Sequence, residues 1–186
     1  MKIKNLAAVA CLALVVALGS GCSTKAVYNS ANPSEKLPIT AKFKVGEIKD
    51  NSGFIASGEY VDPATAMRAA LESELQKAGL AGEEYTLEMT ITEYEPGNAF
   101  GRWLFPGIAG TYLKTKNILY DKNGKPLANI PAERMVAAGG AFTIDAWREA
   151  FNDVAVEIVE VLKREMGILP PKKKTQTESK DDGVSL

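Results

Sequence analysis

The N-terminal segment sets the strongest limit on how this chain can fold, because it contains both cysteines. Met1–Lys4 is short and basic, and Leu6–Leu18 is an unbroken apolar run that includes Cys11. Gly19–Gly21 then leads into Cys22. A basic start, an apolar core and small residues before a cut are the features of a secretory signal peptide. Cleavage before Cys22 leaves one cysteine, so the mature chain has no intramolecular disulfide and must be held together by packing.

The small residues before Cys22 resemble a bacterial lipobox, which usually has Leu three residues before the cysteine. Here Gly19 holds that position, and Leu18 lies one residue earlier. The resemblance implies that residues 1–21 are removed and that Cys22 carries a thioether-linked diacylglycerol and an acylated amino group. Several acyl chains make a durable membrane anchor. Ser23 follows the cysteine, and this pattern resembles sorting to the outer membrane of a Gram-negative bacterium, facing the periplasm.

Two other interpretations of this segment stay open. A permanent transmembrane helix would need roughly 20 apolar residues, and Leu6–Leu18 is shorter than that. Secretory cleavage without lipid uses the same small residues before the cut.

Composition excludes several classes of function. The net charge of −1 argues against a nucleic-acid partner, which calls for a strongly basic chain. The chain has no histidine, and it has no free thiol once Cys22 is lipidated. The commonest general base, the nucleophilic cysteine and the soft metal sites are thereby removed. We therefore expect no catalytic residues, no metal and no cofactor, and we expect a protein that is not an enzyme.

Strand and helix patterns alternate along the rest of the chain. Period-two alternation predicts strands, and apolar residues at helical spacing predict helices. Asp62 and Pro63 are typical of a helix start, and Asn123–Gly124 is typical of a hairpin turn. The first predicted strand begins at Ile39 and is closed by the turn Asp50–Gly53, and the others are 85–92, 111–120 and one within 127–137. The predicted helices are 63–78 and 144–166, with Thr143 as the N-cap of the second.

These elements predict one α+β domain over residues 39–169. Two amphipathic helices need one apolar surface, and about four half-buried strands supply it. We expect a two-layer sandwich in which both helices pack on one face of a mainly antiparallel sheet. Residues 22–38 are polar and without periodicity, so we expect a flexible, lipidated tether, and residues 170–186 are expected to be a disordered polar tail.

An apolar, aromatic stretch interrupts the expected domain between the second and third strands. Connections between strands are usually polar, whereas this one contains Phe100, Arg102, Trp103, Leu104 and Phe105. Exposed apolar patches mark contacts, and Trp and Arg are frequent interface anchors. These five residues are therefore the candidate patch for contact with a partner or a membrane. The alternative is a connection that folds over an open end of the core.

Three stretches together resemble a known group of proteins. They are the segment 96–104, the glycines of 107–110 that lead into a strand, and the turn 121–127 with Gly139–Gly140 and the final helix. They are similar to the YajG-like small lipoproteins of Gram-negative bacteria, a group with a domain of unknown function. The resemblance implies envelope localisation, a small α/β domain and lipidation at Cys22, and it implies no established activity.

The sequence thus favours a non-enzymatic binding or assembly module that is anchored in the outer membrane. Its partner would be the membrane itself, through the lipid, together with an envelope protein or a cell-wall polymer. One alternative is an activator or secretion-associated subunit of an envelope machine. Another is a hydrolase of envelope polymers that uses Glu93 and Glu95, which project to the same side of a strand.

Overall fold

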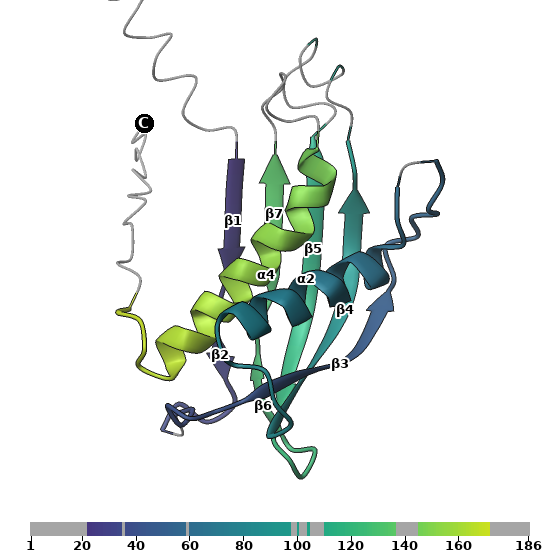
Figure 1. Ribbon diagram of the computed structural model, residues 1–186. Helices are drawn as coiled ribbons and strands as arrows, with labels where there is room; N and C mark the ends of the chain where they lie inside the picture. Colours follow the sequence, from purple (N-terminus) through teal and green to yellow (C-terminus); the bar gives the residue numbers. More distant parts are fainter. Residues whose placement is uncertain are drawn as a thin grey trace, which may run out of the picture.

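In the part of the chain that the structure describes, seven β-strands form one mixed sheet, and two helices cover one of its faces (Figure 1). The computed structural model describes residues 22–34, 36–58, 60–97, 100, 104, 110–136 and 145–171. Along the main path the strands follow the order β1-β7-β5-β4-β3, with β6 beside β5 and β2 beside β6. The elements are β1 (Cys22–Ala26), β2 (Asn29–Ser30), β3 (Phe43–Asp50), α2 (Pro63–Lys77), β4 (Tyr85–Glu95), β5 (Thr111–Tyr120), β6 (Pro126–Asn129), β7 (Ala132–Val136) and α4 (Ala146–Glu165).

Helix α2 forms where its local signals predict it. The Asp62 carboxylate accepts a hydrogen bond from Thr65 N at 2.8 Å, and Pro63 occupies the first turn, where its missing N–H costs nothing. Gly79 ends the helix with a positive φ of 67°, a conformation that glycine adopts without strain. The predicted helix over 63–78 is therefore confirmed to within one residue at its end.

The first predicted strand ends where expected but begins later. The structure places β3 at Phe43–Asp50, up to the predicted turn, whereas the alternation begins at Ile39, which is 67% exposed. Ala41 N donates to Pro38 O at 3.0 Å, which closes a turn in the segment that alternates in sequence. β3 runs parallel to β4, starting at the pair Phe43–Tyr85, because α2 carries the chain back across the sheet between them. Within the described residues, the sheet is therefore mixed, but five of its six strand pairings are antiparallel, as the sequence predicts.

The expected count of four strands is too low for two reasons. The predicted strand within 127–137 is two short strands, β6 and β7, which are separated at Ile130–Pro131. Part of the expected tether forms two more: β1 pairs antiparallel with β7 from Cys22–Val136 to Ala26–Ala132, and β2 pairs with β6. Backbone hydrogen bonds to β7, together with packing of Ala26 and Tyr28 against the core, hold a segment that has no apolar periodicity.

The second predicted helix is confirmed as α4, whose described part begins at Ala146. Asp145 occupies its N-cap position without a side-chain capping bond, and Thr143, the predicted N-cap, lies outside the described residues. Arg134 on β7 forms an ion pair with Asp153 on α4, with 2.7 Å between Arg134 Nε and Asp153 Oδ2. This pair links the helix to the strand that β1 borders.

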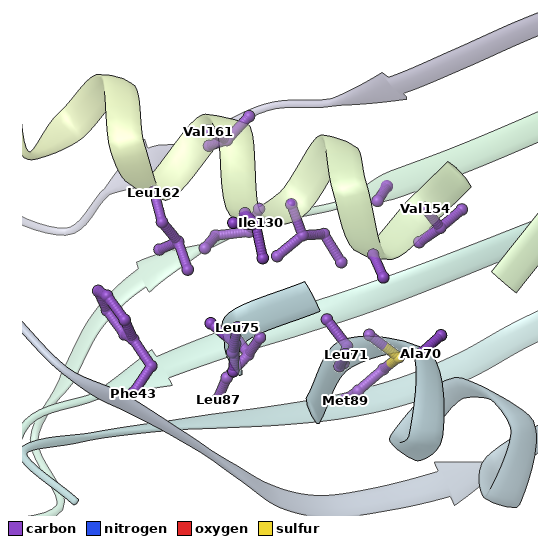
Figure 2. Packing of buried hydrophobic residues seen from close by; sticks show 14 of the residues in the cluster. Phe43, Ala70, Leu71, Leu75, Leu87, Met89, Ile130, Val154, Val161 and Leu162 are labelled. Carbon is purple, nitrogen blue, oxygen red and sulfur yellow. The ribbon is translucent and has the colours of Figure 1, made fainter. Parts of the chain in front are cut away.

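The core lies between the two helices and the sheet (Figure 2). Leu71 and Leu75 of α2 face the sheet beside Val154 and Leu162 of α4, and all four are fully or almost fully buried. Within the described residues, no helix is long and apolar enough to cross a membrane. The opposite face of the sheet carries no helix of the described chain (Figure 1), and we call it the open face.

Candidate functional site at the Cys22 end of the sheet

Strand register brings Cys22 to the same end of the sheet as the apolar stretch. Cys22 pairs with Val136 at the end of β7, and Val136 pairs in turn with Thr111 at the start of β5. β4 ends at Glu95, which lies opposite Tyr112 of β5. The connection from β4 to β5 therefore leaves and re-enters the sheet at the end where β1 begins, at the top of Figure 1.

Phe100 and Leu104 are the members of the predicted patch that the structure describes. Both have helical backbone conformation, and they are 68% and 49% exposed. Arg102, Trp103 and Phe105 lie outside the described residues, so a patch of all five stays a prediction. Ile55 lies in the segment after β3 and is 84% exposed. Because β3 runs parallel to β4, this segment leaves the sheet at the same end as the connection from β4 to β5.

A buried hydroxyl group links the two ends of the connection between β4 and β5. Thr111 Oγ1 donates to Pro96 O at 2.7 Å, and Thr111 is fully buried at the start of β5. Gly97 follows with a positive φ of 67°, which lets the chain turn sharply away from β4. The residues that lead into the apolar stretch are therefore held by the sheet itself.

A cluster of aromatic rings supports this end from below. The Tyr94 ring lies 4.9 Å from that of Phe54 and 5.0 Å from that of Phe151, and Trp147 packs edge-on against Tyr60 at 4.9 Å. The Tyr94 hydroxyl has no hydrogen-bond partner within the described part of the chain. Burial raises the pKa of Tyr94 above its ordinary value, because the phenolate would be desolvated. The cluster is therefore an apolar support in which the folded chain keeps the Tyr94 proton.

The open face carries a row of alternating charges across four strands. Cross-strand pairing places Lys25 beside Glu133, Glu133 beside Lys114, and Lys114 beside Glu93. Lys114 Nζ lies 3.2 Å from Glu93 Oε1, and this hydrogen bond is the main cause of a raised Lys114 pKa. Opposite charges on facing strands stabilise the pairing of those strands.

Glu93 and Glu95 project to the same side of β4, and a register shift between Ile91 and Glu93 places them on this face rather than on the buried one. The Glu93 carboxylate is 53% exposed and paired with Lys114, and Glu95 is also exposed. Solvated carboxylates that pair with a neighbouring lysine are typical of a charged protein surface. Within the described residues, no group of three or more Asp, Glu, Cys or His side chains is placed to hold a metal ion.

A second feature lies at the far end of the sheet, where the chain was expected to be a tether. A cavity of about 270 Å³ is formed there between the segment after β2 and the start of β6. Its lining includes Tyr28, Asn32, Lys36, Tyr85 and Lys125. Sequence reasoning missed this cavity because residues 22–38 have no periodicity. Tyr28, an aromatic residue within a polar stretch, was the one signal that the segment packs against the core.

The family comparison points to a domain without an assigned function. The sequence profile of a domain of unknown function, DUF4410, matches residues 57–140, which run from the segment before α2 to the segment after β7. A comparison with curated protein sequences gives no match.

Three solved structures are similar to this chain at low sequence identity. The PelC dodecamer from Paraburkholderia phytofirmans is 11% identical with a TM-score of 0.52, over 76% of this chain and 96% of that one. Protein XCC0632 from Xanthomonas campestris, of family DUF330, is 9% identical with a TM-score of 0.44, over 70% and 87%. A provisionally assigned lipoprotein from Caulobacter crescentus CB15 is 17% identical with a TM-score of 0.34, over 67% and 92%. The PelC likeness shows a common fold.

Proposed function

We propose that this chain is a lipoprotein of the Gram-negative outer membrane whose periplasmic domain binds or assembles with another envelope component without catalysing a reaction. The observation that carries the proposal is the position of Cys22. It is the first residue of β1, directly after the expected signal peptide, and it pairs with Val136. A lipid on Cys22 would hold the folded domain against the bilayer with no spacer between them.

This placement leaves the open face as the surface available to a partner. β5 runs from Thr111 at the Cys22 end to Tyr120 at the far end, which at about 3.3 Å per residue is roughly 30 Å. The alternating row from Lys25 to Glu93 crosses the face, and Ile118 and Met135 are exposed on it, 39% and 43% respectively. The hollows on this face beside Lys116 and Lys114 measure about 170 and 190 Å³, below the usual size of a small-molecule site. A broad surface with mixed charge and isolated apolar side chains therefore suits a protein or polymer partner better than a small molecule. Membership of the YajG-like group is part of the same proposal.

Intact-mass measurement of the membrane-extracted protein tests the anchor. We expect a chain that begins at Cys22 and carries the added mass of its acyl groups. Cys22→Ser should abolish the addition, whereas Cys11→Ser, a matched change within the removed segment, should leave it unchanged. An unmodified mature mass, or lipid that persists in Cys22→Ser, would contradict the proposal.

A photo-crosslinker at Lys116, on the open face, tests for a partner in intact cells. We expect a discrete crosslinked product from Lys116 and none from the same group at Ser73, an exposed position on α2. Products of equal yield from both positions would mean that the open face is not the binding surface.

The second candidate function is a subunit of a larger assembly. One observation favours it: PelC, which shares the fold, is a dodecamer. In this chain β1 and β3 are the two outer strands of the main sheet path, and an outer strand offers unpaired backbone groups to a neighbour. Light scattering of the detergent-extracted protein distinguishes the two cases, because a monomeric mass would rule out a stable ring of identical subunits.

A further inference from the structure

We infer that the Cys22 end of the domain is a membrane-inserting tip, in which Phe100 and Leu104 enter the bilayer that holds the anchor. This inference rests on the proposed lipidation of Cys22. It adds a contact surface and an orientation, with the Cys22 end facing the lipid and the turn after β5 facing away from it.

The register of three strands limits how far the tip can lie from the lipid. Cys22, Val136 and Thr111 are neighbours on adjacent strands, which lie about 4.8 Å apart. The start of β5 is therefore about 10 Å from the anchored residue, measured across the sheet. The polar layer on each side of a bilayer is itself several ångströms thick. A side chain that projects beyond the ends of these strands therefore reaches the polar layer of the bilayer directly.

The exposed apolar side chains at this end fit a lipid interface. Phe100 and Leu104 are exposed although each has a large apolar surface, and Ile55 leaves the sheet toward the same end. Phe and Leu are typical of the apolar faces that bury into the boundary between headgroups and acyl chains. Because the anchor would already place a bilayer at this end, lipid is the occupant that these side chains meet first.

The far end of the domain has the opposite character. The turn Asp121–Gly124 joins β5 to β6, and Asp121 Oδ1 accepts from Asn123 N at 2.8 Å and from Lys125 N at 2.9 Å. Its residues are polar, and Lys122 and Asn123 are exposed. This turn is therefore a reference point that should stay in water when the tip is inserted.

Depth-dependent quenching of a single fluorophore tests the inference on the mature, lipidated protein in phosphatidylcholine vesicles. Cys22 carries the lipid and no other cysteine remains, so Leu104→Cys and Asn123→Cys each supply a unique thiol for a bimane label. Nitroxide-bearing lipids should quench the label at 104 several-fold more strongly than the label at 123, and aqueous iodide should do the reverse. Equal access of iodide to both labels on vesicle-bound protein would overturn the inference.

A second pair of variants tests the same inference without a fluorescent label. In the mature chain with Cys22→Ser, which lacks an anchor, binding to the same vesicles is measured by flotation. Phe100→Ser with Leu104→Ser should weaken partition by about tenfold, the effect of losing a modest apolar burial. Ile39→Ser, a matched change of an exposed apolar residue near the far end, should leave it unchanged. Equal partition of all three proteins would overturn the inference.

The failure of the anchor is distinguishable from the failure of the tip. A protein without acyl mass would refute the proposed function, whereas a lipidated protein with a water-accessible position 104 would refute only the tip. Protection of position 104 in cells but not in protein-free vesicles would show that a protein covers it, and this too would overturn membrane insertion.

Discussion

Asn117 on β5 holds Ile130 through both its backbone and its side chain. Ile130 N donates to Asn117 O at 2.7 Å, and Asn117 Nδ2 donates to Ile130 O at 2.6 Å. Both residues are fully buried, and Ile130 lies between the end of β6 and the start of β7. The side-chain amide thus satisfies a carbonyl at the point where the sheet ladder is interrupted. A buried polar group would otherwise destabilise this break.

Asn117→Ala should therefore lower the free energy of unfolding by about 1–3 kcal/mol, because it leaves the Ile130 carbonyl buried without its donor. Asn129→Ala, the same change at an exposed position one residue before Ile130, should stay within about 0.5 kcal/mol. Urea unfolding of the two variants beside the unmodified domain makes the comparison. Equal losses would mean that Asn117 contributes no more than a surface residue.

A matched pair of phenylalanines separates the core from the tip. Phe151→Ala should cost about 3–5 kcal/mol, because Phe151 is 2% exposed and packs against Tyr94. Phe100→Ala should cost under about 1 kcal/mol, because Phe100 is 68% exposed. Thermal or denaturant unfolding measures both. A large loss of stability in Phe100→Ala would show that the connection between β4 and β5 belongs to the core. Phe100 would then not be free to enter the bilayer.

Tyr94→Phe should be at least as stable as the unmodified domain at neutral pH. The ring contacts with Phe54 and Phe151 remain, and a buried hydroxyl without a partner in the described chain is removed. Tyr94→Ala, which removes the ring as well, should instead be clearly destabilised.

The same hydroxyl predicts a pH dependence. Burial raises the folded-state pKa of Tyr94, so the folded chain keeps this proton where the unfolded chain releases it. The contribution of Tyr94 to stability is complete below the ordinary tyrosine pKa of about 10 and is lost as the pH rises above that value. The free energy of unfolding, measured at several alkaline pH values, should therefore fall less steeply with pH for Tyr94→Phe than for the unmodified domain. The same pH dependence in both proteins would contradict a buried, protonated hydroxyl.

Removal of β1 and β2 should destabilise the domain, although their sequence predicts a tether. A chain that starts at Ala31 loses the pairing of β1 with β7 and of β2 with β6, and it exposes part of the α4 contact. We expect a loss of about 2 kcal/mol or more, since each buried backbone hydrogen bond contributes about 0.5–1.5 kcal/mol. A chain that ends at Pro171 should change by no more than about 1 kcal/mol. If the two truncations behave alike, the N-terminal segment is a tether after all.

Elements with local signals could be predicted from the sequence to within a few residues. Asp62–Pro63 and Gly79 bound α2, alternation from Tyr85 to Thr92 identifies most of β4, and the turn Asp121–Gly124 bounds β5. β3 begins later than predicted because its alternation extends back into the preceding turn, and only the pairing of Phe43 with Tyr85 decides where the strand begins. The sequence also singled out Cys22 and the apolar stretch, but it contained no indication that the two lie at one end of the molecule.

The sequence by itself determined the two helices, the two long central strands and the absence of any disulfide in a chain cleaved before Cys22, because each depends on residues that are close together in the chain. Only the tertiary structure decided that Cys22 begins a strand, that β3 runs parallel to β4, and that Phe100 and Leu104 share an end with Cys22. The physical reason is that an outer strand such as β1 is held by backbone hydrogen bonds to a distant segment. Those bonds are available to any residue except proline, so they leave no pattern in the side chains.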